Sequence, residues 1–206
     1  MAGVLRAWAS VAEQRPLLTV AATNGALGGL GDLLAQAIES QQPAGRQQAG
    51  WDGQRTARFV AWGAVCAPVF HRWYHLISRV FPLPRRRAQV RGAFTAAVAK
   101  RVAMDQLVYA PAGIAGFYVC MALMEGRGWG AAVARLRERY WATLAANYAV
   151  WPAVQAVNFG FVPPIYRVPF GSVVSIFWNS FMSWTNVQAA QAGERRRRQA
   201  LHEKQQ

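Results

Sequence analysis

The sequence predicts an all-α integral membrane bundle of four transmembrane helices, with short interfacial helices and a C-terminal half-span. Of its 206 residues, 53% are apolar and only 16% are charged, whereas a soluble domain usually carries about 25% charged residues. Apolar segments long enough to cross a bilayer recur along the chain. The 23 basic residues outnumber the 9 acidic ones and lie mostly between these segments and at the C-terminus, as in membrane proteins with positive loops on one side. This placement argues against nucleic acid as a direct partner, which the net charge of +14 would otherwise favour.

The N-terminal region predicts a surface helix followed by the first span. Residues 1–15 place apolar side chains on one helical face and polar ones on the other, which indicates an amphipathic interfacial helix. Residues 16–38 are long enough to cross a membrane. Gly25 and Gly29 form a GxxxG pair there, which lets helix backbones pack closely in lipid. No GxGxxG motif is present, so a dinucleotide-binding turn is rejected.

The middle of the chain predicts two further spans. A polar linker covers residues 39–57, and the second span runs over residues 59–77, with a kink expected at Pro68. Residues 79–101 are strongly basic and are expected to form a loop. The third span follows over residues 102–124.

The C-terminal third predicts the fourth span and a shorter segment. Residues 125–139 indicate another surface helix, and residues 140–162 form the fourth span. The apolar stretch 170–184 has only 15 residues, too few for a full crossing, and is expected to be shallow or re-entrant. The expected organisation is an interfacial helix over 1–15, a transmembrane helical domain over 16–187 and a basic disordered tail over 188–206.

Charge asymmetry favours four crossings. With four spans, 15 basic residues share the side of the N-terminus and 7 lie on the other side. A fifth crossing would change the split to 10 against 12 and remove the asymmetry. Since basic loops favour one side of a membrane, both termini are expected on the same side.

Polar side chains inside the spans are the candidate functional residues. In the fourth span, Asn147, Trp151, Gln155 and Asn158 recur at helical spacing and share one face. Such a stripe either lines a water-filled path or joins helices by hydrogen bonds, and the sequence leaves both open. Asp32 is expected to pair with Arg58 or Arg101. The complete set of pore or helix-contact candidates is Asn24, Asp32, Asp105, Gln106, Asn147, Trp151, Gln155, Asn158 and Arg167.

The sequence supports neither a metal site nor an enzyme. His71 and His75 have a spacing that can bind metal, but Arg72 stands where a zinc-protease motif needs Glu, and no third ligand is evident. Cys66 and Cys120 lack metal-ligand spacing. No nucleophile, base and orienting residue form a readable set. We therefore expect no cofactor, no metal and no catalytic activity.

The order of residues in the C-terminal third resembles the Mpv-seventeen family of organelle membrane proteins. The family's pattern is matched by WPAVQAVNFGFVPPIYR and WNSFMSW, and weaker collinear matches extend it over residues 16–184. The matching residues are Trp151, Pro152, Gln155, Asn158, Phe159, Val162, Pro163, Arg167, Trp178, Asn179 and Ser183, with Gly31, Asp32, Gln36, Arg58, Gly63, Pro68, His71, Trp73, Tyr74, Asp105, Gln106 and Pro111 upstream. Within this family, which includes the small peroxisomal membrane protein of mammals, the chain is most similar to the fungal Sym-one-like mitochondrial branch.

The resemblance implies a multi-pass protein of the mitochondrial inner membrane, or alternatively of the peroxisomal membrane. It implies a non-selective or weakly selective pore with roles in organelle homeostasis, stress response and maintenance of mitochondrial DNA. A non-conducting structural or scaffolding protein is the alternative. The expected partners are the bilayer, anionic lipid near Arg167, small solutes or ions, and a second copy of the chain.

Overall fold

The computed structural model describes residues 2–40, 50–84 and 91–180, and all its regular structure is helical. The prediction of an all-α fold is therefore confirmed. The elements in order are α1 (Ala2–Gln14), α2 (Pro16–Glu39), α3 (Gly53–Val80), α4 (Arg91–Met104), the π-helical turn η1 (Asp105–Tyr109), α5 (Ala110–Met124), α6 (Gly128–Phe161) and the 3-10 turn η2 (Pro164–Tyr166). Residues 167–180 form a further helix.

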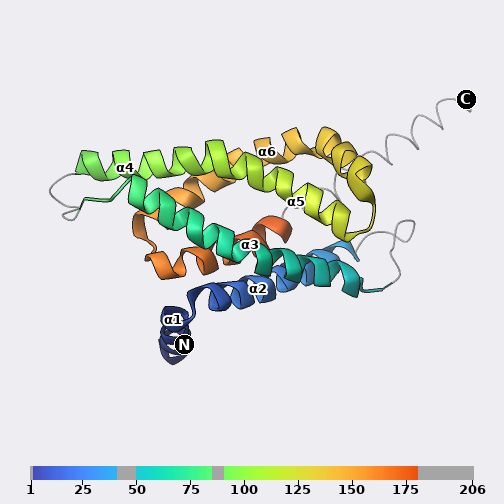
Figure 1. The fold of residues 1–206 in the computed structure, drawn as a ribbon, viewed down its shortest axis with the longest axis horizontal. Coiled ribbons are helices and arrows are strands. Elements are labelled where there is room, and N and C mark those ends of the chain that lie inside the picture. Colours follow the sequence, from blue (N-terminus) through green and yellow to red (C-terminus); the bar gives the residue numbers. More distant parts are fainter. Residues whose placement is uncertain (1, 41–49, 85–90, 181–206) are drawn as a thin grey trace, which may run out of the picture.

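Four long helical rods run alternately back and forth along the molecule (Figure 1). They are α2, α3, the continuous segment α4–η1–α5, and α6. The helix over 167–180 turns back from the end of α6, and α1 lies across the end of the bundle where α2 begins (Figure 1). Helices α2 and α3 form one closely packed pair and α5 and α6 another, whereas α3 and α5 touch each other little. The bundle therefore consists of two helical hairpins that leave room between them.

Local sequence explains where the helices begin and turn. Pro16 occupies the first turn of α2, a position where its missing N–H is not needed. The Asp52 side chain accepts a hydrogen bond from the Arg55 amide and caps α3. Gly126 and Gly128 adopt positive φ angles of 70° and 74°, which allows the short reversal between α5 and α6.

The α2–α3 pair is close because glycines face backbone. A Cβ atom added to Gly63 would lie 2.5 Å from the carbonyl oxygen of Asn24, and one added to Gly28 would lie 2.8 Å from that of Phe59. Gly25 and Gly29, the predicted packing residues, both lie against Val60 of α3.

Two predictions on the helices are wrong. Residues 91–101 are not loop, because α4 begins at Arg91 and continues through η1 and α5 to Met124; its alanines favour helix despite the basic residues among them. Residues 125–139 and 140–162 are not a surface helix and a separate span, because one 34-residue helix, α6, runs from Gly128 to Phe161 with Pro152 inside it.

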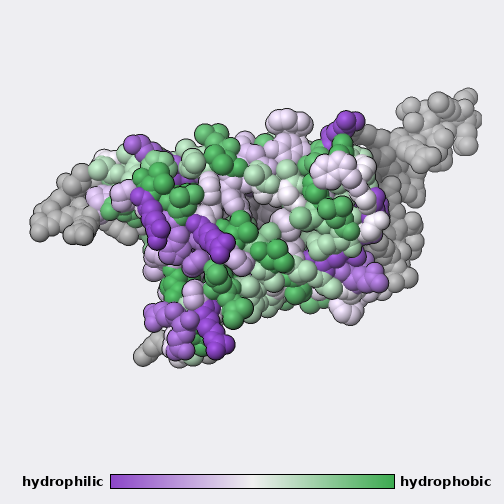
Figure 2. Space-filling view, in the orientation of Figure 1, coloured by the Kyte–Doolittle hydropathy of each residue, from purple (hydrophilic) through white to green (hydrophobic). Residues whose placement is uncertain are grey.

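Within the described ranges, two helical segments are long and apolar enough to cross a membrane, Pro16–Glu39 and Gly92–Met124. Figure 2 shows apolar and weakly polar residues over the middle of the visible face and hydrophilic residues gathered toward its two ends. Four crossings, the shallow 170–184 segment and the division into interfacial, transmembrane and tail regions stay predictions. The predicted tail and most of the predicted linker lie outside the described residues.

Candidate functional site

A buried carboxylate, Asp105, stands at the centre of a cluster of polar side chains. It is 2% exposed and lies at the start of the π-helical turn. Its Oδ1 atom accepts a hydrogen bond from the indole of Trp73 at 2.9 Å, and its Oδ2 atom accepts from the amides of Gln155 at 2.8 Å and Gln106 at 2.9 Å. The described contacts of this carboxylate are thus to neutral N–H donors, which satisfy a buried charge only in part.

The amide stripe of α6 supplies most of the remaining contacts. Gln155 also donates to the hydroxyl of Tyr74 at 3.2 Å, and its Oε1 accepts from Asn158 at 2.9 Å. Asn147 donates to Gln106 at 2.9 Å. These bonds join α3, η1 and α6 into one network, which we call the polar cluster: Tyr74, Asp105, Gln106, Asn147, Gln155 and Asn158.

The π-helical turn explains how neighbouring residues both reach this network. A π turn accommodates one residue more than an α turn, and such turns often occur at functional sites. Asp105 and Gln106 are adjacent in sequence, yet both are buried, and they bond to Gln155 and Asn147 two turns apart on α6.

Two buried arginines close the bundle beside the C-terminal end of α6. Arg167, 4% exposed, donates to the carbonyl of Val162 at 3.2 Å and to the hydroxyl of Ser78 at 2.7 Å. Arg101, 3% exposed, donates to the carbonyls of Phe81 at 2.8 Å and Phe159 at 3.4 Å. Cations are favoured beside the last carbonyls of a helix because of its dipole. Arg167 is buried in the bundle, where its guanidinium donates to the Val162 carbonyl and the Ser78 hydroxyl, and its expected attraction for anionic lipid stays a prediction.

On the other side of the polar cluster, three cavities follow one another. An inner cavity of about 170 Å³ is bordered by Asp105, Gln106, Asn147 and Gln155 together with Asn24 and Trp151. An aromatic cavity of about 480 Å³ shares Asn24, Asn147 and Trp151 with it. A vestibule of about 640 Å³ shares Phe117, Tyr118 and Trp178 with the aromatic cavity. The three are therefore contiguous.

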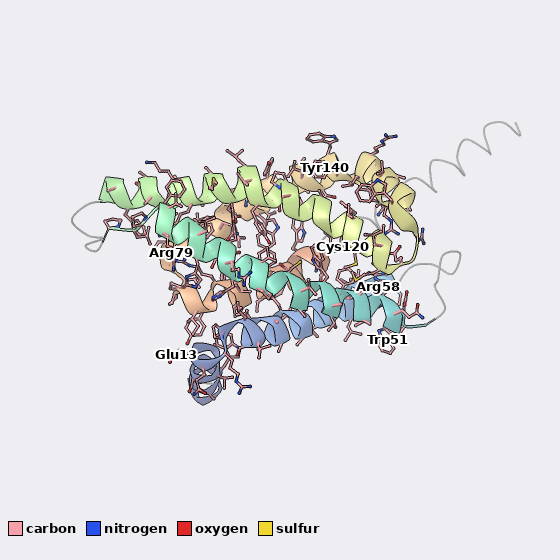
Figure 3. All side chains as sticks on the ribbon, in the orientation of Figure 1. Glu13, Trp51, Arg58, Arg79, Cys120 and Tyr140 are labelled. Carbon is pink, nitrogen blue, oxygen red and sulfur yellow. The ribbon has the colours of Figure 1, made fainter. Side chains whose placement is uncertain are left out.

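The vestibule is charged, unlike the aromatic cavity. Its lining includes five arginines and four acidic residues, which are Arg55, Arg58, Arg127, Arg135, Arg139, Asp32, Glu39, Asp52 and Glu125. Figure 3 shows Arg58 and Cys120 toward this end of the bundle and Arg79 toward the other. The hydrogen bond from Arg135 lowers the pKa of Glu125, aided by the charges of Arg127 and Arg58. An aqueous ionic compartment thus leads to an apolar one and then to the polar cluster.

Asp32 lies at the vestibule and not in the polar cluster. Arg55 Nε lies 2.7 Å from its Oδ1 atom, while Thr56 and Gln36 donate to Oδ2 at 2.6 and 2.7 Å. The predicted partners, Arg58 and Arg101, are wrong. Arg58 instead lies 3.8 Å from Asp52, and Arg101 lies at the opposite end beside Phe81.

The structure groups the remaining candidates by their place along the cavities. Asn24 borders the inner cavity and accepts a hydrogen bond from Ser172 of the 167–180 helix. Asn158 is fully buried behind Gln155, and its Oδ1 atom has no hydrogen-bond partner among the described residues.

Sequence reasoning missed Tyr74 and Trp73 as members of this site. Both follow His71 near the end of a span, which is typical of the membrane–water interface. The available signal was Asp105 itself, because a carboxylate in an apolar segment needs several donors, and Trp N–H and Tyr O–H groups are the donors that aromatic side chains provide.

The histidines and cysteines form no metal centre in the described ranges. The rings of His71 and His75 lie with their centroids 4.5 Å apart and their planes tilted by 57°, and no group of three or more potential ligands occurs among the residues described. Cys66 and Cys120 are unbridged.

Comparison with known proteins places the chain in a family. Residues 122–183 match the Mpv17 / PMP22 family, a segment that contains all of α6 and the 167–180 helix. The chain is 38% identical over 191 residues to Protein sym1 of Schizosaccharomyces pombe, covering 87% of this chain and 89% of that protein. It is 36% identical over 175 residues to Protein SYM1 of Saccharomyces cerevisiae, covering 84% and 85% of the two chains.

A third relative agrees, and structural comparison adds nothing. Protein SYM1 of Eremothecium gossypii is 39% identical over 179 residues, covering 86% of this chain and 93% of that protein. No solved structure matches. Identity of this extent over most of both chains confirms the resemblance found in the sequence, and the chain belongs to the Mpv17 / PMP22 family.

Proposed function

We propose that the protein is a channel-like protein of the mitochondrial inner membrane with a weakly selective path for small solutes or ions. The observation that carries this proposal is the series of contiguous cavities, from the charged vestibule through the aromatic cavity to the inner cavity. A polar lining inside a helical bundle is expected where water or solute enters. Similarity to the SYM1 proteins supports the mitochondrial location, and the roles in stress response and mitochondrial DNA maintenance are those that membership of the family implies.

The polar cluster would be the closed point of this path. Beyond the inner cavity, Tyr74, Gln155 and Asn158 are hydrogen-bonded to one another or to Asp105, and Phe159 behind them is fully buried. Opening would require these bonds to be exchanged for bonds to water or solute. Solute would enter this path from the vestibule end, and the polar cluster would close its other end.

Cysteine accessibility tests the path. Ser175 borders the inner cavity and the aromatic cavity. A single cysteine would be introduced there, as Ser175→Cys, in a background with Cys66→Ser and Cys120→Ala. In sealed proteoliposomes we expect a small charged thiol reagent to modify it from the vestibule side only. A cysteine at Val157, an exposed position of α6, is the lipid-facing control. Equal protection of both positions from both sides would exclude an aqueous path.

Flux through the reconstituted protein tests conduction directly. We expect small-solute efflux from liposomes to rise with protein content and to increase in a Tyr74→Phe, Gln155→Ala double variant, which weakens the closed point. An unchanged, protein-independent leak in both preparations would favour the scaffolding alternative. The same hydrogen bonds also support the scaffolding alternative. Asn147 and Gln155 bond α6 to η1, and Asn158 bonds to Gln155 within α6.

A further inference from the structure

The aromatic cavity opens sideways, between α3 and α5. Its lining includes Val69 of α3, which is 53% exposed, and the exposed Ala112 of α5. These two helices pack on α2 and α6 and make few contacts with each other. Figure 2 shows the surface hollowed between them. Because the surrounding surface is apolar, this opening faces the part of the molecule expected to lie in hydrocarbon.

Glycines on the two sides of the opening have opposite roles. A Cβ atom at Gly63 of α3 would meet the backbone of α2 at 2.5 Å. A Cβ atom at Gly116 of α5 would find its nearest neighbour, the Trp62 ring, at 3.8 Å, and one at Gly113 would meet only Tyr109 of its own turn, at 3.5 Å. The α5 glycines therefore widen the cavity and do not serve close helix packing.

The chemistry of the cavity changes along its length. Aromatic side chains of α3, α5, α6 and the 167–180 helix line it, namely Phe59, Trp62, Phe117, Trp151 and Trp178. Its volume of about 480 Å³ is in the range of about 300–1,000 Å³ found for ligand pockets. At one end it passes into the vestibule with its excess of arginine.

Arg58 is the vestibule arginine that is largely buried yet lacks a close ion pair, whereas Arg127 and Arg139 are 63% and 59% exposed. Arg55 is engaged by both Asp32 and Glu39, and Arg135 forms a paired contact with Glu125. Arg58 has one described ion pair, with Asp52 at 3.8 Å, and its side chain is 19% exposed. Asp52 lies beyond hydrogen-bond distance of the Arg58 guanidinium, so a ligand carboxylate could form a charge-assisted hydrogen bond there that Asp52 does not make.

We propose that the aromatic cavity and vestibule bind a long-chain fatty acid, with its carboxylate at Arg58 and its alkyl chain between α3 and α5. The ligand enters laterally from the bilayer, so its head stays at the charged end of the bundle while its chain remains in an apolar environment. This site lies in the proposed path but does not depend on conduction, because binding is measured without flux.

The test is photo-crosslinking of palmitic acid carrying a diazirine in its chain to the purified protein in lipid nanodiscs. We expect crosslinks at Trp62, Phe117 and Tyr118, reduced at least fivefold by excess palmitate and much less by hexadecanol, which has the same chain without the charge. Arg58→Gln should reduce cavity crosslinking at least fivefold, whereas Arg137→Gln, an exposed position outside the cavity lining, should not. Gly116→Leu, which fills the cavity, should abolish it, whereas Gly130→Leu, where a Cβ meets open space, should not.

Three results would overturn the proposal. Crosslinks confined to outward-facing residues such as Val65 or Leu107 would show ordinary lipid contact. Equal competition by hexadecanol and palmitate would remove the role of the carboxylate. Equal competition by succinate would show that the vestibule binds soluble anions and that the alkyl chain is not recognised. Thermal unfolding of each variant separates loss of binding from loss of fold.

Discussion

At the scale of single residues, Asp105 determines how the interior of the bundle is organised. Its two carboxylate oxygens accept hydrogen bonds from Trp73 of α3, Gln106 of η1 and Gln155 of α6. Hydrogen bonds to a charged acceptor typically contribute about 1.5–3 kcal/mol each. Replacing one carboxylate oxygen by an NH₂ group would place a hydrogen-bond donor opposite the N–H donors of the neighbouring side chains, which would then lose their acceptor.

We therefore predict that Asp105→Asn destabilises the fold by about 2 kcal/mol or more, since buried donors left without acceptors cost about 1–3 kcal/mol. Tyr74→Phe should cost about 1 kcal/mol or less, because Gln155 keeps its bond to Asp105 when the hydroxyl is removed. Thermal unfolding of both variants in the same detergent measures the order. A Tyr74→Phe variant less stable than Asp105→Asn would contradict the central position of the carboxylate.

The sequence could predict which polar residues are buried but not which groups they bond. Asn147, Gln155 and Asn158 were recognisable because amides on one face of an apolar helix need partners. Asp32 illustrates the limit: its partner Arg55 lies one turn before the predicted Arg58, and a one-turn shift between two packed helices depends on contacts such as those of Gly25 and Gly29, which spacing alone does not fix.

At the scale of helices, the two hairpins are built by different means. The α2–α3 pair depends on glycines against backbone carbonyls, a typical way for helices to pack in lipid. The reversal between α5 and α6 depends on positive-φ glycines and on ion pairs of Glu125 with Arg127 and Arg135. These differences can be tested separately.

We predict opposite effects of alanine at two glycines. Gly63→Ala should destabilise strongly, because its Cβ would overlap the Asn24 carbonyl and force α2 and α3 apart. Gly116→Ala should be neutral or stabilise by up to about 1 kcal/mol, since its Cβ has space and alanine favours helix. Thermal unfolding of the pair is the measurement. Similar loss of stability in both would show that α5 is packed as closely as α2.

The Glu125 ion pairs predict a pH-dependent contribution to stability. Because Arg135 lowers the folded-state pKa of Glu125 below its ordinary value near 4.5, the interaction stabilises the folded state above that pH and is lost as the pH falls through the lowered pKa. We expect Glu125→Gln to lower the unfolding temperature at pH 7. The loss in free energy of unfolding should be less than about 1 kcal/mol, because the group is partly solvated. The difference from the unmodified protein should shrink on acidification below pH 4.5. A constant difference across this range would assign the effect to packing.

The helices themselves were only partly predictable. The 16–38 segment is predictable because it is mostly apolar over the length of a crossing, despite Asn24 and Asp32, and α2 agrees with it closely. The sequence predicts a loop over residues 79–101 because the segment is strongly basic, and arginine and lysine are mostly exposed in proteins. In the structure Arg101 is buried against helix-end carbonyls, and such a tertiary partner for a cation is not visible in local sequence.

At the scale of the whole molecule, the long helices alternate in direction along the bundle. Helix α2 begins and α6 ends at the same end of the bundle (Figure 1). This arrangement is consistent with the charge asymmetry of the loops, and it gives the vestibule and the polar cluster opposite positions along the bundle.

We predict that tags at the N- and C-termini lie on the same side of the membrane, as the split of 15 against 7 basic residues requires. Protease protection in sealed mitochondria or vesicles should give the same result for both tags. A reporter in the α5–α6 turn, near Gly126, should show the opposite protection and serves as control. Opposite protection of the two termini would establish an odd number of crossings.

The π-helical turn has a consequence for the angular setting of the rod that contains it. One extra residue in a helix displaces the faces on its two sides by about 100° relative to an uninterrupted α-helix. Helices α4 and α5 therefore follow one axis, but the side chains of one are rotated about that axis relative to the other. Arg101 can thus face the C-terminal end of α6, while Tyr118 forms a hydrogen bond with Thr143 nearer the middle of α6. If the extra residue moved along the rod by one turn, the residues it passed would rotate by about 100° while both ends of the rod kept their orientation. Asp105 and Gln106 lie in the segment that such a movement would turn.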